Sequence, residues 1–128
     1  MTKVSIDTIY MERPSYKELN NKIEQARKAA LESRISIVDP ETIAADALEI
    51  GYLVEDISNV LVDILNEITP GNYAGQKPPQ RSYEDKIKGS ELFAFKWESK
   101  FFGCAIYLKF TVIKDQMWLV SFHQAREA

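Results

Sequence analysis

The residues of this chain that are best able to do chemistry lie near its carboxy-terminal end, on alternate positions of two short runs. Tyr107 and Lys109 belong to residues 105–113, and His123, the only histidine, ends a second run that follows the polar residues 114–116. On neighbouring strands these three side chains would share one face. Histidine accepts or donates a proton near neutral pH and lysine attracts a phosphate, so the group suits proton transfer beside a phosphate.

Five other basic residues could complete such a site. We expect Lys86 to join the catalytic group, and we expect the remaining four to bind the substrate: Lys96, Lys88, Arg81 and Lys77. Each assignment has an ordinary structural alternative. His123 could be hydrogen-bonded to solvent at a fraying end, Tyr107 could simply favour a strand, and Lys86 and Lys88 could be solvated loop charges.

The sequence lacks the signatures of most familiar enzyme classes. It has no Gly-rich phosphate loop, no nucleotide-binding fingerprint and no metal-ligand spacing, and Cys104 is its only cysteine. We therefore expect neither a metal nor a cofactor. A metal-free set of basic residues suits cleavage of RNA, because the 2′-hydroxyl is a built-in nucleophile that needs only a base, an acid and nearby positive charge.

Length and composition predict one domain, residues 1–128, in a reducing cytoplasm. The chain is long enough for a hydrophobic core without disulfides, and no apolar run approaches the roughly 20 residues of a membrane span. The net charge of −3 is unevenly distributed: residues 1–70 hold 7 Lys and Arg against 13 Asp and Glu, and residues 71–128 hold 9 against 6. The second half is therefore expected to attract phosphate, unless two ordinary solvated surfaces merely differ.

Three helices are predicted between residues 14 and 70. Residues 14–34 carry apolar side chains at helical spacing, the segment from Asp39-Pro40 to Gly51 has a helix start and stop, and residues 53–68 form a third apolar stripe. Residues 71–82 are rich in Gly and Pro, which predicts a surface loop that either connects two elements or borders the site.

Alternating apolar residues predict an antiparallel meander over residues 91–123. In its last strand, Trp118, Val120 and Phe122 are expected on the face opposite to Leu119, Ser121 and His123. The aromatic residues of the meander are expected in the core: Phe93, Phe95, Trp97, Phe101, Phe102 and Trp118. The predicted fold class is α+β, with the helices on one face of an antiparallel sheet of at least three strands.

Part of the chain resembles the MqsR (motility quorum-sensing regulator) toxins. The match consists of Ile106-Tyr107-Leu108-Lys109-Phe110-Thr111-Val112-Ile113, then Asp115, then Val120-Ser121-Phe122. Weaker matches upstream, at Ala47-Leu48-Glu49-Ile50-Gly51, Asn59-Val60-Leu61 and Asn72-Tyr73, extend the resemblance over residues 43–123. It implies a RelE-like fold and a metal-independent mRNA interferase of a type II toxin–antitoxin system, with a cognate antitoxin protein as partner.

The resemblance assigns Tyr107 to the family's active-site tyrosine, and it places His123 where the family has a lysine after Ser-Phe. Another family lysine follows a Phe-Tyr pair, where this chain has Ala74. The family's glutamine follows a tryptophan of the first strand, where this chain has Ala94. Lys77 or Lys86 would have to replace the missing lysine.

Two other classes of function stay open beside an endoribonuclease toxin. A catalytically inactive module of the same fold would bind RNA or a protein, and the missing lysine and glutamine and the negative net charge favour it. An enzyme acting on a small metabolite ranks last, because the sequence carries no cofactor motif.

Overall fold

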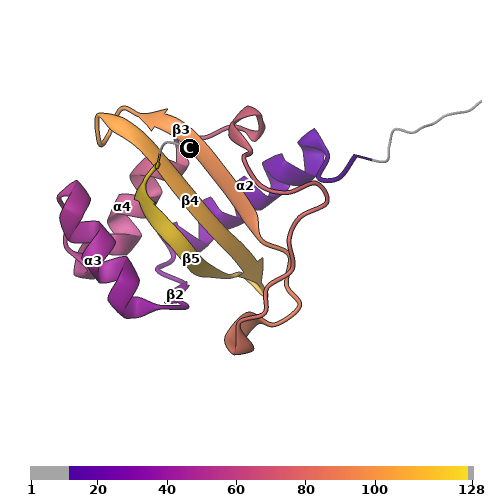
Figure 1. The fold of residues 1–128 in the computed structure, drawn as a ribbon, viewed down its shortest axis with the longest axis horizontal. Coiled ribbons are helices and arrows are strands. Elements are labelled where there is room, and N and C mark those ends of the chain that lie inside the picture. Colours follow the sequence, from indigo (N-terminus) through magenta and orange to yellow (C-terminus); the bar gives the residue numbers. More distant parts are fainter. Residues whose placement is uncertain (1–11, 127–128) are drawn as a thin grey trace, which may run out of the picture.

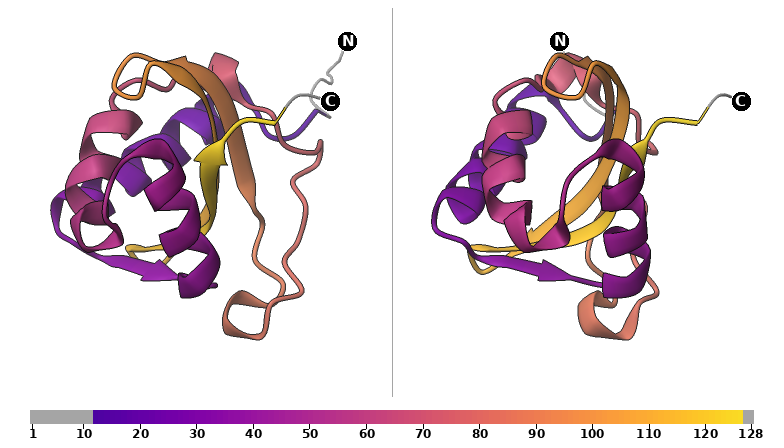
Figure 2. Two further views of the ribbon diagram at one scale, coloured as in Figure 1. Left: turned by 60° about the vertical axis from the view of Figure 1, so that its left-hand side comes forward. Right: turned by 90° about the vertical axis from the view of Figure 1, so that its left-hand side faces the viewer.

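The computed structural model describes residues 12–126, in which three α-helices pack against a four-stranded mixed sheet (Figures 1 and 2). The helices are α2 (Tyr16–Leu31), α3 (Pro40–Ile50) and α4 (Ile57–Leu65). The strands are β2 (Ile35–Ile37), β3 (Phe93–Ser99), β4 (Cys104–Ile113) and β5 (Gln116–Gln124), and their order in the sheet is β2-β5-β4-β3. The coarse prediction of an α+β fold is confirmed. Helices α2 and α4 lie on one face of the sheet, whereas α3 lies beside β5 at its edge (Figure 2).

The helix ends follow from their capping residues. The Ser15 side chain accepts a hydrogen bond from the Glu18 amide at the start of α2, and Asp39 does the same for Thr42 at the start of α3. Gly51 ends α3 in the left-handed conformation, with φ of +98°. The third helix is shorter than predicted, because residues 54–56 form a 3-10 turn and α4 ends at Leu65.

The core lies between the helices and the sheet. Phe93, Phe95 and Trp97 on β3 are buried as predicted, and the rings of Phe95 and Phe110 stack with their centres 5.8 Å apart. The core prediction is wrong for Phe101, which lies in the β3–β4 turn and is 50% exposed. The remaining two aromatic residues are half-buried: Phe102 packs against the core, and Trp118 pairs with Thr111 on β4.

A bulge in β5 changes the predicted alternation. Phe110 pairs with Leu119, but Lys109 pairs with Ser121, so Val120 is an extra residue without a partner on β4. As a result Leu119 and Phe122 are both fully buried, although strict alternation would put them on opposite faces. The predictions that Phe122 shares a face with Trp118, and that Leu119 shares a face with His123, are therefore wrong, whereas the separation of Phe122 from His123 is confirmed.

Strand β2 was not predicted, and it makes the sheet mixed rather than antiparallel. It pairs in parallel with β5, where Ser36 lies opposite Trp118 and accepts a hydrogen bond of 2.8 Å from the Gln116 side chain. Residues 73–92 pass along the free edge of β3 and over the sheet face that the helices leave open (Figure 2). Within residues 12–126, no helix has the length and apolar character needed to span a bilayer.

Candidate functional site

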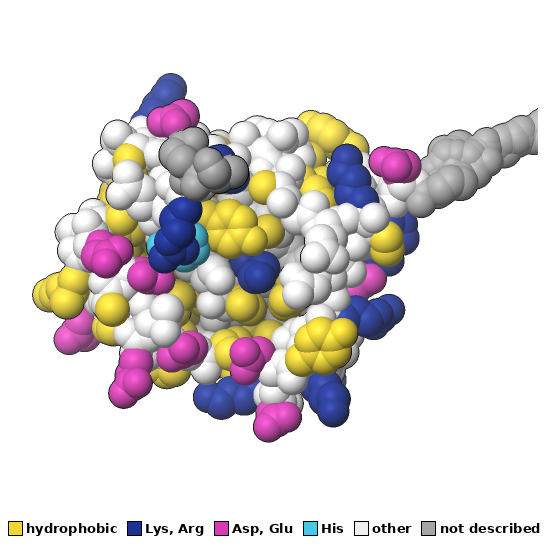
Figure 3. Space-filling model, in the orientation of Figure 1, with side chains coloured by type: hydrophobic (Ala, Val, Ile, Leu, Met, Phe, Trp, Pro, Cys, Tyr) yellow, Lys and Arg dark blue, Asp and Glu magenta, His cyan; other side chains and the backbone are white. Residues whose placement is uncertain are grey.

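The site lies on the side of the sheet that faces away from the helices, which we call the outer face and define by Lys96, Tyr107, Lys109, Ser121 and His123. Figure 3 looks onto this face. Lys96 on β3, Tyr107 on β4 and His123 on β5 are direct cross-strand partners, so they form one row across three strands. Lys109 and Ser121 are paired in the next row along.

The rings of Tyr107 and His123 stack on each other. Their centres are 5.3 Å apart and their planes differ by 22°. Burial raises the pKa of the Tyr107 phenol, which therefore keeps its proton at neutral pH and can donate a hydrogen bond but not act as a base. The predicted convergence of the phenol and the imidazole is confirmed by this geometry.

His123 has a defined hydrogen-bond arrangement. Its Nδ1 lies 2.8 Å from the backbone oxygen of Gln124, which can only accept, so Nδ1 donates. Nη1 of Arg126 lies 3.0 Å from Nε2 and 3.3 Å from Nδ1, so the guanidinium lies over the imidazole ring and not in line with one of its nitrogens. With Nδ1 as the donor to Gln124, Nε2 carries the lone pair, and the guanidinium beside the ring could equally bind a phosphate.

Two adjoining hollows open on the outer face beside the segment 73–92. The first hollow, of about 260 Å³, extends to the Tyr107 and Lys109 side chains; its other lining residues are Ala74, Gly75, Gln76, Gln80, Leu92 and Ala94. The second hollow, of about 180 Å³, is lined by Gln80, Ser82, Tyr83, Glu84, Leu92, Lys109 and Val120. Lys109 belongs to both hollows and so lies where they meet.

Backbone contacts hold the wall of the first hollow against β3. The Ala74 amide donates to the Ala94 oxygen at 2.8 Å, and the Leu92 amide donates to the Gln80 oxygen at 2.7 Å. The Tyr73 hydroxyl donates to the Gln76 oxygen, and a Cβ on Gly75 would lie only 2.6 Å from that hydroxyl. Glycine at this position therefore allows the wall to pass close to the Tyr73 ring.

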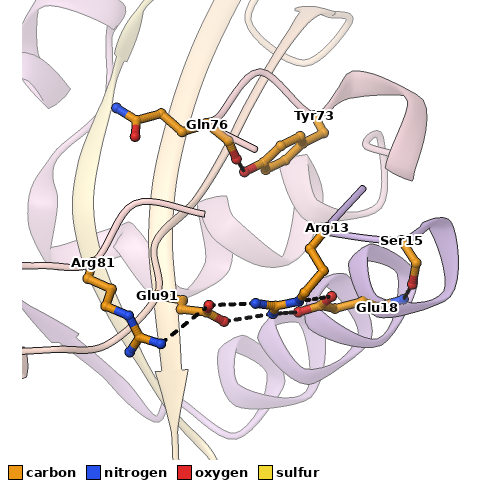
Figure 4. A network of polar contacts seen from close by, with 7 residues as sticks. All are labelled: Arg13, Ser15, Glu18, Tyr73, Gln76, Arg81 and Glu91. Atoms are coloured by element: carbon orange, nitrogen blue, oxygen red, sulfur yellow. Dashed lines mark hydrogen bonds and ion pairs between the residues drawn. The ribbon is translucent and has the colours of Figure 1, made fainter. Parts of the chain in front are cut away.

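An arginine network ties the same segment to α2 (Figure 4). Arg13 donates to both carboxylate oxygens of Glu91, at 2.8 and 2.9 Å, and also bonds Glu18. Arg81 donates to the Gly89 oxygen, and its second terminal nitrogen lies 4.0 Å from Glu91. The hydrogen bond from Arg13 is the main cause that lowers the pKa of Glu91, so this carboxylate stays charged and keeps the network joined.

The predicted site residues fall into two groups. His123, Tyr107, Lys109 and Lys96 lie together on the outer face, with His123 half-buried and Lys96 exposed. Of the predicted residues, only Tyr107 and Lys109 line the two hollows. The second group is exposed on the 73–92 segment: Lys77, Arg81, Lys86 and Lys88. Lys86 helps to lower the pKa of Asp39, after larger contributions from Thr42 and Glu41.

Three residues of the site were missed from the sequence. Gln76 and Gln80 lie in the predicted loop, where nothing in the local pattern marks a side chain that faces a hollow. Arg126 follows the only histidine by three residues, and this basic residue just beyond the strand was the signal that could have found it.

Acidic side chains border the outer face on the side of α3. Asp and Glu gather over α3 in the space-filling view, whereas Lys and Arg lie nearer to the histidine and the β3 side (Figure 3). A polyanion on this face is therefore attracted toward the hollows and repelled from α3. Among residues 12–126, no three His, Cys, Asp or Glu side chains are grouped as metal ligands would be.

No protein-family model and no curated protein matches the chain.

Proposed function

We propose that this chain is an MqsR-type endoribonuclease with a RelE-like fold, the toxin of a type II toxin–antitoxin system, and that its outer face binds and cleaves mRNA. The observation that carries the proposal is the row of Lys96, Tyr107 and His123, with Lys109 beside it, on an open sheet face next to two hollows. The proposal also requires the protein to act in the cytoplasm, where transcripts are found.

The proposed reaction needs no group from outside the chain and the RNA. Nε2 of His123 takes the proton of a 2′-hydroxyl, O2′ attacks the adjacent phosphorus, and the bond from phosphorus to O5′ breaks. Lys109 gives a proton to the leaving O5′, while the Tyr107 hydroxyl and Lys96 stabilise the charge on the phosphate oxygens. Arg126, whose guanidinium lies beside the imidazole, binds the same phosphate, and the products carry a 2′,3′-cyclic phosphate and a 5′-hydroxyl.

The positions that the resemblance singles out support this assignment, because they meet in space although they are far apart in the sequence. Ala74 and Ala94 share a backbone hydrogen bond and line the first hollow together with Tyr107, and Tyr107 stacks on His123.

The test is cleavage of RNA by the purified chain in the presence of a metal chelator. His123→Ala is expected to lower the rate by about 10²- to 10⁴-fold, the usual contribution of a general acid or base. Lys28→Ala, on the exposed surface of α2, is the control that should cleave as the wild type does. Equal cleavage by wild type and His123→Ala, or intact RNA with both, would contradict the proposal.

A gain of activity offers a second test. Ala74 is exposed at the mouth of the first hollow, so a lysine there can reach the phosphate position beside Tyr107 without disturbing the core. Ala74→Lys is expected to raise the cleavage rate by about tenfold or more, in line with one added charge contact in the transition state. Asn20→Lys adds the same charge on the exposed side of α2 and should leave the rate unchanged.

The second candidate function is binding of RNA without cleavage. It is favoured by the methyl groups of Ala74 and Ala94, which occupy the positions where the family has a lysine and a glutamine. A binding module would hold RNA with an affinity that falls steeply as salt is added, yet would leave the strand intact. Ala74→Lys would then be the variant in which cleavage first appears.

The toxin assignment also requires an antitoxin as protein partner. A small adjacent reading frame whose product binds this chain and prevents RNA cleavage would support it. Growth of bacteria that express the chain alone should stop, and growth of bacteria that express His123→Ala should not.

A further inference from the structure

We propose that the two hollows hold the bases of two consecutive nucleotides, and that Tyr83 and Glu84 select the second base by stacking on it and by accepting hydrogen bonds from an amino group. This inference rests on the proposed function, since it requires RNA on the outer face, and it adds the path of the strand and its base preference.

The spacing of the hollows matches a dinucleotide step. They share Gln80, Leu92 and Lys109, so they are neighbours on either side of the Lys109 side chain. Two consecutive bases are joined through one phosphodiester, and a cation between two base sites is the group that attracts this phosphate. Lys109 therefore binds the phosphate between the two nucleotides, with the first base in the hollow beside Tyr107 and the second base in the hollow beside Tyr83.

Tyr83 is placed to stack on a base. It is 87% exposed, the highest value among the exposed large hydrophobic side chains of residues 12–126. An aromatic ring left in solvent at the edge of a hollow offers a flat surface to a nucleobase, as in other proteins that bind single strands. Tyr16, 72% exposed on α2, lines neither of the two hollows and serves as a comparison.

Glu84 makes the second hollow suited to a base and unsuited to a phosphate. Its carboxylate repels a phosphate but accepts hydrogen bonds, so it favours bases with an exocyclic amino group over uracil. The Glu84 amide donates to the Ser82 hydroxyl oxygen at 3.0 Å, which fixes the turn that carries both Tyr83 and Glu84. The Gln80 amide can donate and accept, and so adds a contact to either base.

The charge on the outer face supports the same path. A strand that runs from His123 on β5 through Tyr107 and Lys109 on β4 to Tyr83 leads away from the acidic α3 (Figure 3). The alternative path, toward α3, would bring the phosphates close to carboxylates.

The experiment measures binding of fluorescent 2′-O-methyl RNA pentamers, which lack the nucleophile and cannot be cleaved by the proposed route. Wild type is expected to bind the cytidine pentamer more tightly than the uridine pentamer. Tyr83→Ala should raise the Kd about 5- to 100-fold, the range that one lost stacking contact gives, whereas Tyr16→Ala should not change it. Glu84→Gln should reduce the preference for cytidine by about threefold or more, and Glu49→Gln, on the exposed surface of α3, should keep it.

Each other outcome overturns the inference in a recognisable way. If wild type binds neither pentamer, the proposed function fails as well. If wild type binds RNA and Tyr83→Ala binds like Tyr16→Ala, only the path through the second hollow is wrong. If Tyr83→Ala loses affinity for a partner protein but not for RNA, the hollow is a protein-binding surface. Because both side chains are exposed, unchanged thermal unfolding of the variants will show that they fold.

Discussion

Glu67, which follows α4, joins the helical layer to the β3–β4 turn, and its replacement should destabilise the protein measurably. Its Oε1 accepts a hydrogen bond of 2.8 Å from the indole nitrogen of Trp97, and its Oε2 accepts one of 2.8 Å from the Phe101 amide. Trp97 is only 7% exposed, so water cannot easily replace the first of these bonds. The sheet edge that carries Lys96 therefore depends on this carboxylate.

The size of the effect follows from the two bonds. A hydrogen bond to a charged group contributes about 1.5 to 3 kcal/mol, and a buried donor left without a partner costs about 1 to 3 kcal/mol. Glu67→Ala leaves the buried indole N–H of Trp97 without an acceptor, whereas the Phe101 amide in the exposed turn can hydrogen-bond to water. We expect Glu67→Ala to lose about 2 to 3 kcal/mol of unfolding free energy and Glu67→Gln, which keeps one acceptor, about 1 kcal/mol.

The effect should depend on pH with a definite sign. Burial alone would raise the pKa of Glu67, but the hydrogen bonds from Trp97, Ser99 and the turn backbone outweigh it and lower the pKa. A lowered pKa in the folded state gives stability that is present above the carboxyl's unfolded pKa and is lost as the pH falls through the folded value. The difference in unfolding free energy between wild type and Glu67→Gln should thus be largest near pH 7 and decrease in acid.

Urea denaturation followed by tryptophan fluorescence, at pH 7 and across the acid range, measures these differences. Asp63→Ala, an exposed carboxylate on α4, is the control and should stay within about 0.5 kcal/mol of wild type. The reasoning would be refuted if Glu67→Ala were as stable as Asp63→Ala at pH 7, or if its deficit grew in acid.

Two further predictions concern stability and use the same denaturation assay. Phe95→Ala removes a fully buried ring that stacks on Phe110 and should lower the unfolding free energy by about 3 to 5 kcal/mol. Phe101 is half exposed in the turn, so Phe101→Ala should lower it by less than about 1 kcal/mol. Gly103→Ala should lower the unfolding free energy by about 1 to 2 kcal/mol, because the φ of Gly103 is +71°, although no atom crowds a Cβ there. Gly71, whose φ is not left-handed, is the control, and Gly71→Ala should lower the unfolding free energy by less. Equal losses in the two variants would contradict the strain argument.

The helices could be predicted from the sequence because their signals are local. A capping side chain acts within one turn, and a proline or glycine fixes the backbone of a single residue, so the Asp39-Pro40 start and the Gly51 stop of α3 needed no knowledge of the rest of the chain. The third helix was overestimated, because its apolar stripe continues to Ile68 although the backbone leaves the helix at Leu65. Ile68 is buried from the irregular segment that follows the helix.

Strand β2 could not be predicted because its pairing is entirely non-local. Its three residues are too few to show alternation, and they become a strand only where β5 offers them a parallel partner. The positions of Gln76 and Gln80 have the same origin. They face the hollows because Ala74 and Leu92, at either end of the segment, are bonded to β3 and to Gln80, contacts that no local pattern specifies.

The meeting of Tyr107 and His123, in contrast, was predicted correctly although it depends on the bulge that the sequence did not reveal. If the pairing of Phe110 with Leu119 continued without the extra residue, Tyr107 would lie opposite Phe122, and His123 would face the helices opposite Ile106. Val120 shifts the register by one, which buries Phe122 in the core and returns His123 to the outer face. Burial of Phe122 and exposure of the imidazole are thus coupled. The hydrophobic free energy of a fully buried phenylalanine, about 1.5 to 3 kcal/mol, holds the proposed base beside the phenol.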